Sequence, residues 1–400
     1  MNSILSDRVL QMEESATLAM AKKARELKAQ GVDIIGLSLG EPDFKTPKHI
    51  QQAAKDAIDE GKYFAYPPVS GYQDLREAIA KKLREENNIQ EAKAEHIVVS
   101  VGAKHSIANT FMCLLNEGDE VVIFSPYWVS YAEIIKLCGG VPVLIEGTLE
   151  NNFKASAAQL EAAITSKTKA VIYSSPCNPT GSVFSQQELE AIANVVKKHE
   201  GVMVIADEIY ELINFMGKNF SIASLPGMFD RTITVNGFSK GYAMTGWRVG
   251  YICAPLEVSK AVEKMQGQFT SGNTGIAQRA ALAGIAGDQG PSQEMAVQYL
   301  KRRDLMLGLL RDIPGIKTHV PEGAFYFFPD VTAFFGKSAH GHQVNNADEL
   351  CMYLLDIANV SLVTGSAFGA DNCVRISYAA SESDLIEAMK RMKKALGELA

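Results

Sequence analysis

Apolar and polar positions follow their most regular pattern in the middle of this chain. From His96 onward, short apolar runs alternate with longer amphipathic segments. The apolar runs predict strands at residues 97–101, 120–124, 141–145, 169–173, 202–206, 232–235 and 248–253. Continuous apolar strands separated by helices are typical of a mostly parallel sheet that helices cover on both faces. We therefore predict an α/β fold built on a large sheet of seven strands.

The flanking segments combine helical periodicity with shorter strands. Helices are expected at 15–30, 72–86, 293–312, 347–357 and 383–396, and strands at 34–39, around His319, and at 324–328 and 374–378. Two helix starts carry capping signals: Ser185 with Glu188 forms a capping box, and Thr46 is expected to cap a helix that Pro47 begins. The C-terminal mixture of helices and strands predicts a second, smaller α+β domain.

Length and composition limit the number of domains, the kinds of ligand and the location of the protein. Four hundred residues exceed what one core usually holds, so we expect an N-terminal arm (1–14), a segment belonging to the small domain (15–45), a large domain (46–289) and a small C-terminal domain (290–400). A net charge of −7 argues against a nucleic-acid surface. The N-terminus lacks a signal-peptide pattern and no apolar run could span a membrane, so a cytoplasmic protein is expected.

Cysteine and histidine patterns predict neither a disulfide framework nor a metal site. The six cysteines are scattered singly, mostly among apolar residues, and are expected to be reduced. His340 and His342 flank one glycine, but nothing nearby completes a ligand set, so a polar loop is the expected structure.

Candidate chemistry lies where the predicted strands end, since ligands of such sheets bind beyond the carboxyl ends of the strands. Lys240 follows the 232–235 strand in a turn of small residues. It is either a solvated loop lysine or, with its pKa lowered by burial and by a cation such as Arg248, an amine that forms a Schiff base. Arg248 is equally suited to clamping a phosphate.

Two further strand ends favour an anionic, flat ligand. Gly102, Ala103 and Lys104 open a helix after a strand, which is either a plain tight turn or an anion site made by free backbone N–H groups. The pattern matches neither a P-loop nor a dinucleotide fingerprint. Trp128 follows the 120–124 strand and either packs in the core or covers a heteroaromatic ring.

Charged groups also occur in strands that usually exclude them. Asp207 follows a buried-type strand and needs a partner, which is a salt bridge, a helix cap or a protonated ring nitrogen. Tyr210 lies three residues later and can reach the same ligand. Arg375 interrupts an apolar strand, where it forms a structural ion pair or binds a carboxylate, and Asn178 can assist either role. Together these residues are what an enzyme using pyridoxal 5'-phosphate (PLP) requires.

At this point the sequence strongly resembles the class I/II aminotransferases of PLP fold type I, in particular the bacterial aspartate and prephenate aminotransferase branch. The matching motifs run in order through nearly the whole chain: Ser15-Ala16-Thr17, Gly40-Glu41-Pro42-Asp43, Asn178-Pro179-Thr180-Gly181, Asp207-Glu208-Ile209-Tyr210, Ser239-Lys240 and Arg375-Ile376-Ser377-Tyr378. The resemblance implies that amino groups are transferred in two half-reactions.

The resemblance also implies roles for individual residues. Lys240 would carry PLP as a Schiff base and shuttle a proton, and Asp207 would keep the ring nitrogen protonated. Tyr210 and Asn178 would contact the ring oxygen, and Trp128 would stack on the ring. Gly102, Ala103, Lys104 and Arg248 would surround the phosphate, while Arg375, Gly40 and Asn178 would bind the substrate α-carboxylate.

Assembly and specificity follow from the same resemblance. Tyr66 is similar to a tyrosine that the family donates to the phosphate of the neighbouring subunit, which implies a homodimer with shared sites. No counterpart of the mammalian-type arginine for the side-chain carboxylate is evident, and Lys104, Ser15 and Thr17 are expected to replace it. Two positions depart from the common pattern: Gly237 replaces a phosphate-binding serine, and Cys177 replaces an asparagine.

L-Aspartate with 2-oxoglutarate is the favoured substrate pair, and the sequence leaves several alternatives. These are transfer to prephenate or an aromatic 2-oxo acid, a kynurenine aminotransferase and a β-lyase. Transcription regulators also use this fold as a ligand sensor, but they carry an N-terminal DNA-binding domain, and here the expected arm reaches the aminotransferase body within 14 residues.

Overall fold

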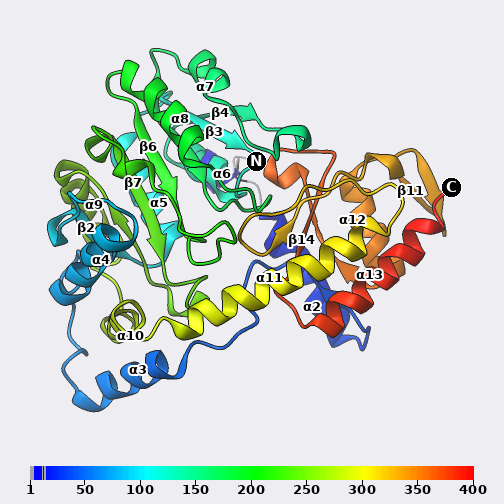
Figure 1. The fold of residues 1–400 in the computed structure, drawn as a ribbon, viewed down its shortest axis with the longest axis horizontal. Coiled ribbons are helices and arrows are strands. Elements are labelled where there is room, and N and C mark those ends of the chain that lie inside the picture. The colour runs from blue at the N-terminus through cyan, green and yellow to red at the C-terminus, as the bar shows by residue number, and fades with distance from the viewer. Residues whose placement is uncertain (1–3, 11, 13–14) are drawn as a thin grey trace.

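A computed structural model describes residues 4–10, 12 and 15–400. Its centre is a seven-stranded sheet in the order β2-β8-β7-β6-β5-β3-β4 (Figure 1). The strands are β2 (Ile97–Ser100), β3 (Glu120–Ser125), β4 (Val141–Glu146), β5 (Thr168–Ser174), β6 (Met203–Asp207), β7 (Thr232–Gly237) and β8 (Gly250–Cys253). All neighbours pair in parallel except β8, which is antiparallel to both β2 and β7. The predicted mostly parallel sheet is confirmed, and its strands lie where the apolar runs placed them.

Helices bury both faces of this sheet because its strands are apolar on both sides. One face packs against α5 (Ala103–Leu114), α6 (Ser130–Leu137) and α9 (Leu256–Phe269). The other face packs against α7 (Ala157–Ala163) and α8 (Gln186–Lys198) at one end, and against α3 (Lys48–Glu60), α4 (Gln73–Glu86) and α10 (Gly275–Ala286) at the other. Neighbouring residues of β6 point to opposite faces of the sheet. Ile205 packs on the face covered by α5, and Ala206 packs on the face covered by α8.

A second core forms from both ends of the chain. Ile35 and Leu37 pack there together with Met306, Leu354 and Met392. Its helices are α2 (Ala16–Ala29), α11 (Gly290–Arg311), α12 (Ala347–Ala358) and α13 (Glu382–Gly397), and a further short helix is α1 (Asp7–Leu10). Figure 1 shows α11 running from the neighbourhood of α10 to that of α13, so it connects the sheet to this second part of the molecule.

The strands of the second part are short. They are β1 (Ile35–Gly36), β9 (Tyr326–Phe327), β10 (Lys337–Ala339), β11 (His342–Val344), β12 (Val360–Ser361), β13 (Val363–Thr364) and β14 (Val374–Ser377). β1 pairs in parallel with β12, and β14 lies between β13 and β9 in an antiparallel sheet. The pairing of β1 with β12 attaches the N-terminal segment to the C-terminal part of the chain.

Two local predictions are wrong. The segment around His319 forms no strand but only an isolated bridge at Lys317, and the His319 ring packs against Phe153 instead. Thr46 does not cap α3, whose N-cap is Pro47, because its hydroxyl donates a hydrogen bond to the carbonyl oxygen of Ala243 at 2.6 Å. Both differences arise from contacts with distant segments.

The predicted capping box and the predicted state of the cysteines are both found in the structure. The Ser185–Glu188 capping box is present at the start of α8, and the six cysteines are free thiols. Within the described part of the chain, no cluster of three or more His, Cys, Asp or Glu side chains could hold a metal ion, and His340 pairs with Glu398 at 2.8 Å. Among the same residues, no helix has the length and apolar character needed to cross a bilayer.

Candidate active site

The carboxyl ends of the central strands open onto a cavity of about 740 Å³. β5 ends there at Ser174 and β6 at Asp207, while β9 and β14 contribute Tyr326 and Arg375 from the second part of the molecule. The sequence-predicted residues that line the cavity are Ser15, Thr17, Gly40, Ala103, Lys104, Trp128, Asn178, Asp207, Tyr210, Lys240, Arg248 and Arg375. Residues separated by up to 360 positions therefore meet in one place.

Two predicted residues do not line the cavity. Gly102 lies immediately before α5 with a φ of +83°, and a Cβ at this position would collide with the Arg248 guanidinium. Glycine therefore allows both the left-handed turn and the close approach of the arginine. Tyr66 lies outside the cavity on a loop and is 90% exposed.

Lys240 follows β7 and reaches the centre of the cavity. Its Nζ donates a hydrogen bond to the carbonyl oxygen of Gly40 at 2.5 Å. Burial is the main reason that the pKa of Lys240 falls to about 8, and Arg375 and Arg248 lower it further, against the opposing effect of Glu41 and Asp207. Lys240 is therefore about half uncharged at pH 8, and the uncharged amine is the form that acts as a nucleophile.

Asp207 is buried at the end of β6. Its Oδ2 accepts a hydrogen bond of 2.5 Å from the Tyr131 hydroxyl, and its Oδ1 accepts one of 3.2 Å from the backbone N–H of Ile209. Burial raises the pKa of Asp207 to about 6, although these hydrogen bonds and the charge of Lys240 oppose the rise. Tyr210 lies at the same end of the cavity, where its hydroxyl is 2.6 Å from that of Tyr326.

The start of α5 and two cations also line the cavity. The N-terminal turn of α5 carries Ala103 and Lys104, and Arg248 lies against the preceding turn, 3.4 Å from the carbonyl oxygen of Val101. The Nζ of Lys104 lies 4.9 Å from the centre of the Trp128 ring. Burial, and secondarily the charge of Arg248, lowers the pKa of Lys104. A helix N-terminus next to two cations is suited to bind an anion such as phosphate.

Arg375 is a buried cation without a counter-ion among residues 4–10, 12 and 15–400. Its Nη1 donates to Asn178 Oδ1 at 2.9 Å and its Nη2 to the carbonyl oxygen of Ser38 at 2.6 Å. Its Nε is buried and finds no hydrogen-bond acceptor in the described part of the chain. Because a buried charge is costly unless it is paired, this guanidinium favours an anionic ligand in the cavity.

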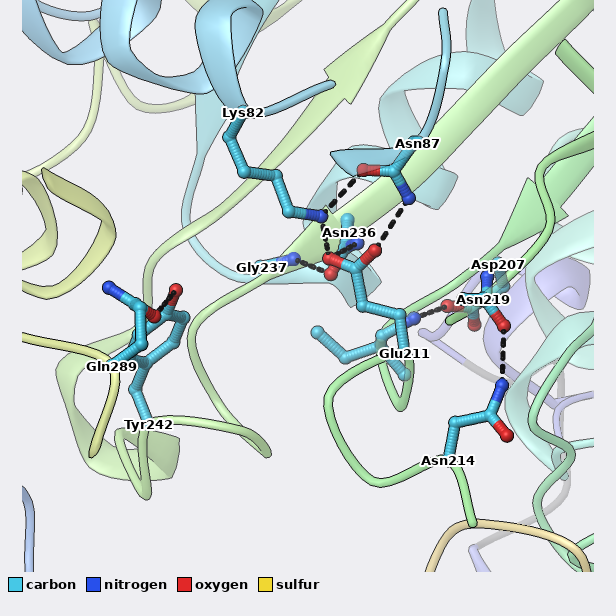
Figure 2. A network of polar contacts seen from close by, with 11 residues as sticks. Lys82, Asn87, Asp207, Glu211, Asn214, Asn219, Asn236, Gly237, Tyr242 and Gln289 are labelled. Carbon is cyan, nitrogen blue, oxygen red and sulfur yellow. Dashed lines mark hydrogen bonds and ion pairs between the residues drawn. The ribbon is translucent and has the colours of Figure 1, made fainter. Parts of the chain in front are cut away.

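A buried polar network fixes the segments that carry Asp207 and Lys240 (Figure 2). The Glu211 carboxylate forms an ion pair with Lys82 of α4 and accepts hydrogen bonds of 2.7 Å from Asn87 and from Asn236 of β7. Asn236 in turn accepts a hydrogen bond of 2.7 Å from the backbone N–H of Gly237. The network therefore ties the segment after β6 to the end of β7 and to α4.

The sequence did not single out several residues in or beside the cavity, among them four that interact with the predicted site residues: Ser38, Glu41, Tyr131 and Tyr326. Tyr131 left a usable signal, because it follows Trp128 by three residues in the amphipathic segment after the 120–124 strand, and this spacing brings two side chains of a helix to one face. Tyr326 left none, since its place depends on the pairing of β9 with β14. At Gly237, a Cβ would lie 2.8 Å from the Cα of Gly250, so the close pairing of β7 and β8 accounts for the missing side chain.

Comparisons with known proteins agree with this geometry. The family described as aminotransferase class I and II matches residues 32–392. A probable aspartate/prephenate aminotransferase of Rhizobium leguminosarum bv. phaseoli is 46% identical over 398 residues, which are 99% of each chain. The crystal structure of the aspartate aminotransferase from Rhizobium meliloti superposes with a TM-score of 0.95 at 39% identity and covers 100% of both chains.

A third similar protein is the aspartate aminotransferase from Thermus thermophilus with maleate. Its structure has a TM-score of 0.92 at 41% identity and covers 99% of this chain and 100% of its own. The two structural matches cover 100% and 99% of this chain, and therefore both parts of the fold. The chain described here belongs to the class I and II aminotransferase family.

Proposed function

We propose that this protein is a PLP-dependent aminotransferase that transfers the amino group of L-aspartate to 2-oxoglutarate. The observation that carries the proposal is a buried Arg375 that forms no ion pair with any described residue. It lines the same cavity as Lys240, whose pKa is lowered to about 8. A carboxylate ligand would neutralise the guanidinium, and an uncharged lysine is the group that PLP requires for covalent attachment.

The residues of the cavity fit PLP at three points. Lys240 would attach the cofactor, the buried Asp207 would face its ring nitrogen, and the start of α5 with Arg248 would hold its phosphate. Trp128 borders the cavity between these points and offers a flat surface for the ring. Tyr210 and Asn178 would contact the oxygen substituent of the ring.

When bound, PLP supplies a ring that accepts the electron pair released as the Cα–H bond of the substrate breaks. The residues of this chain perform the remaining tasks. Arg375 would hold the α-carboxylate with its Nε, with Gly40 and Asn178 nearby, so that the Cα–H bond faces Lys240. Once the substrate amine has displaced it from the cofactor, the freed Lys240 amine would take the proton from Cα. In the second half-reaction it would give a proton to Cα of the new amino acid.

The preference for a dicarboxylic substrate rests on the other wall of the cavity. Lys104, Ser15 and Thr17 line it, and the Ser15 hydroxyl makes no capping hydrogen bond to α2. A second carboxylate needs a second cation, which Lys104 would provide, while the two hydroxyls would complete its hydrogen bonds. Both solved relatives cited above are aspartate aminotransferases, and maleate in one of them is a dicarboxylate.

Prephenate is the second candidate acceptor. The Rhizobium leguminosarum relative is named a probable aspartate/prephenate aminotransferase, and it covers 99% of this chain. Prephenate also carries two carboxylates, so Arg375 and Lys104 suit it as well. Its larger body is the feature that distinguishes it from 2-oxoglutarate.

We further propose a two-fold homodimer in which Tyr66 of each subunit completes the phosphate site of the other, together with a cytoplasmic location. The exposure of Tyr66 beyond the cavity of its own subunit supports the shared site. Residues 15–45 and 290–400 are proposed to form one small domain, and 46–289 the large one, because Ile35 and Leu37 pack in the same core as α11, α12 and α13.

An absorbance spectrum of the purified protein incubated with PLP tests the cofactor and the reaction. We expect a visible band that L-aspartate bleaches and that 2-oxoglutarate or prephenate restores in separate samples. The oxo acid that restores it faster is the preferred acceptor. A protein that stays colourless would contradict the proposal, and Lys240→Ala should abolish turnover.

Replacement of Lys104 tests the substrate preference. Lys104→Ala should lower kcat/KM for aspartate and glutamate by about tenfold or more and spare neutral amino acids, since a charge-assisted hydrogen bond contributes about 1.5–3 kcal/mol. Lys48→Ala is the control, because Lys48 is exposed at the start of α3 and does not line the cavity. Equal losses for acidic and neutral substrates would instead assign Lys104 to the phosphate site.

A further inference from the structure

Tyr131 is a buried tyrosine whose hydroxyl points at the most buried carboxylate of the cavity. It lies in the first turn of α6, three residues after Trp128, and it is only 1% exposed. Its ring contacts the Trp128 ring edge-on, with the ring centres 5.4 Å apart. The start of α6 thus presents two aromatic side chains to the cavity region, one that lines it and one that reaches Asp207 behind it.

The Asp207 carboxylate depends on this hydroxyl. Asp207 is 4% exposed, and besides Tyr131 its hydrogen-bond partner among the described residues is the Ile209 backbone at the longer distance of 3.2 Å. A hydrogen bond from a hydroxyl to a carboxylate is strongest at 2.5–2.7 Å, which is the range of the Tyr131 contact. The oxygen on the Ile209 side therefore has more capacity left for another donor.

Several ionisable groups surround Asp207. Lys240 favours its charged form. In addition to their burial, the charge of Asp207 in turn raises the pKa values of Glu208, Cys177 and Tyr210, which lie close by. Burial is the largest influence and raises the pKa of Asp207 to about 6. Without the Tyr131 hydroxyl, which lowers this pKa, the carboxyl would be protonated over a wider range of pH.

We propose that Tyr131 is a positioning residue that orients the Asp207 carboxylate and keeps it ionised, with one oxygen held by the tyrosine and the other available to a protonated ring nitrogen. The proposal rests on the proposed function, because the ring nitrogen belongs to PLP. It concerns only this chain's hydrogen bond between Tyr131 and Asp207 and requires no contact between Tyr131 and the cofactor.

Tyr131→Phe tests the proposal because it removes one oxygen and keeps the ring against Trp128. The matched control is Tyr173→Phe, since Tyr173 is also fully buried but its hydroxyl has no hydrogen-bond partner in the described part of the chain. The affinity of each apo-protein for PLP is measured by absorbance titration across pH. We expect about tenfold weaker binding at neutral pH for Tyr131→Phe and unchanged binding for Tyr173→Phe.

The pH dependence separates positioning from packing. In Tyr131→Phe, the hydrogen bond that lowers the pKa of Asp207 is lost. PLP affinity and kcat/KM both fall on the acid side of their pH profiles, and we expect this acid limb to move to higher pH. A packing defect would lower stability, visible in thermal unfolding, but would leave the limb in place. An unmoved acid limb, or losses equal to those of Tyr173→Phe, would overturn the proposal.

A double-mutant cycle with Asp207→Asn shows whether Tyr131 acts through Asp207. Tyr131→Phe should cost about tenfold in PLP affinity with Asp207 present and little in the Asp207→Asn background, where there is no carboxylate to keep ionised. Equal losses in both backgrounds would overturn the proposal. A wild-type protein that binds no PLP would overturn both this proposal and the proposed function. If the wild type binds PLP and the affinity losses of Tyr131→Phe and Asp207→Asn simply add in the double variant, only the proposal about Tyr131 is overturned.

Discussion

At the scale of single residues, burial moves the pKa values of Lys240 and Glu208 in opposite directions toward the same value. Burial disfavours the charged form in both, so the amine becomes more acidic and the carboxyl less so. The pKa of Lys240 falls to about 8, and burial, followed by the charge of Glu211, raises that of Glu208 to about 8. Near pH 8 each group is therefore about half uncharged, and at neutral pH Glu208 is mostly uncharged while Lys240 is mostly protonated.

For Lys240, the lowered pKa predicts how fast the apo-protein captures PLP covalently. The capture rate should rise with pH to a plateau with a midpoint near 8, because only the uncharged amine attacks an aldehyde. Glu41→Gln should move the midpoint to lower pH, since the Glu41 charge favours the protonated amine. Stopped-flow absorbance measures the rate, with Lys240→Ala as the control. A midpoint near that of a free lysine would contradict the assignment.

For Glu208, the raised pKa predicts a pH-dependent cost to stability. The folded state binds the Glu208 proton more tightly than the unfolded state, so its contribution is fully present below about pH 4.5 and is lost as the pH rises toward about 8. Neither carboxyl oxygen has a partner within hydrogen-bonding geometry among the described residues, and burial and Glu211 raise the pKa more than the nearby Ser221 hydroxyl lowers it. Glu208→Gln should therefore gain more than about 1 kcal/mol over the wild type between pH 5 and pH 8.

Urea unfolding of both proteins across this pH range measures the gain from Glu208→Gln. The exposed Glu60, which pairs with Lys62 at the surface, supplies a control substitution, Glu60→Gln, whose effect should change little with pH above 5. A difference between the Glu208 variant and the wild type that stayed constant with pH would show that Glu208 is charged in the folded protein.

At the scale of elements, Glu211 connects three parts of the fold. It joins α4, the segment after β6 and the end of β7, and both partners of the Lys82–Glu211 ion pair are less than 10% exposed (Figure 2). Glu211→Ala leaves Lys82 buried without its counter-ion and should cost about 3–5 kcal/mol of unfolding free energy. Replacing both partners, as in Lys82→Met with Glu211→Leu, should cost less than the single change.

Chemical denaturation of these variants measures the loss in their free energy of unfolding. Glu161→Ala breaks an exposed pair with Lys198 and should cost less than about 1 kcal/mol, which sets the scale for a surface contact. If Glu211→Ala were as mild as the Glu161 change, the network would not hold these elements together.

At the scale of the whole molecule, the exposed Tyr66 predicts complementation between subunits. Tyr66→Ala should weaken PLP binding about tenfold by removing one hydrogen bond to a charged phosphate. A hybrid of one Tyr66→Ala subunit and one Lys240→Ala subunit should contain one complete site, whose lysine and tyrosine come from different chains. Hybrids isolated with two affinity tags should bind PLP covalently with wild-type affinity at that site. Weak binding there would contradict the shared site.

The sequence predicted elements well where the pattern is local. The seven strands were located from apolar runs, and the Ser185 capping box was recognised from two residues. It failed at Thr46 and around His319, where side chains interact with Ala243 and Phe153 rather than with their own neighbours. A local pattern contains no information about such distant partners.

The sequence by itself determined the order and type of the main elements, the mostly parallel sheet and the family, because periodicity and ordered motifs are properties of neighbouring residues. It also singled out the charged residues at strand ends, since few charges are tolerated there. Only the tertiary structure decided the strand order, the contact of Tyr131 with Asp207 and the place of Tyr326. These depend on which distant segments pair, and pairing is selected by the free energy of the whole packed core rather than by any short stretch of chain.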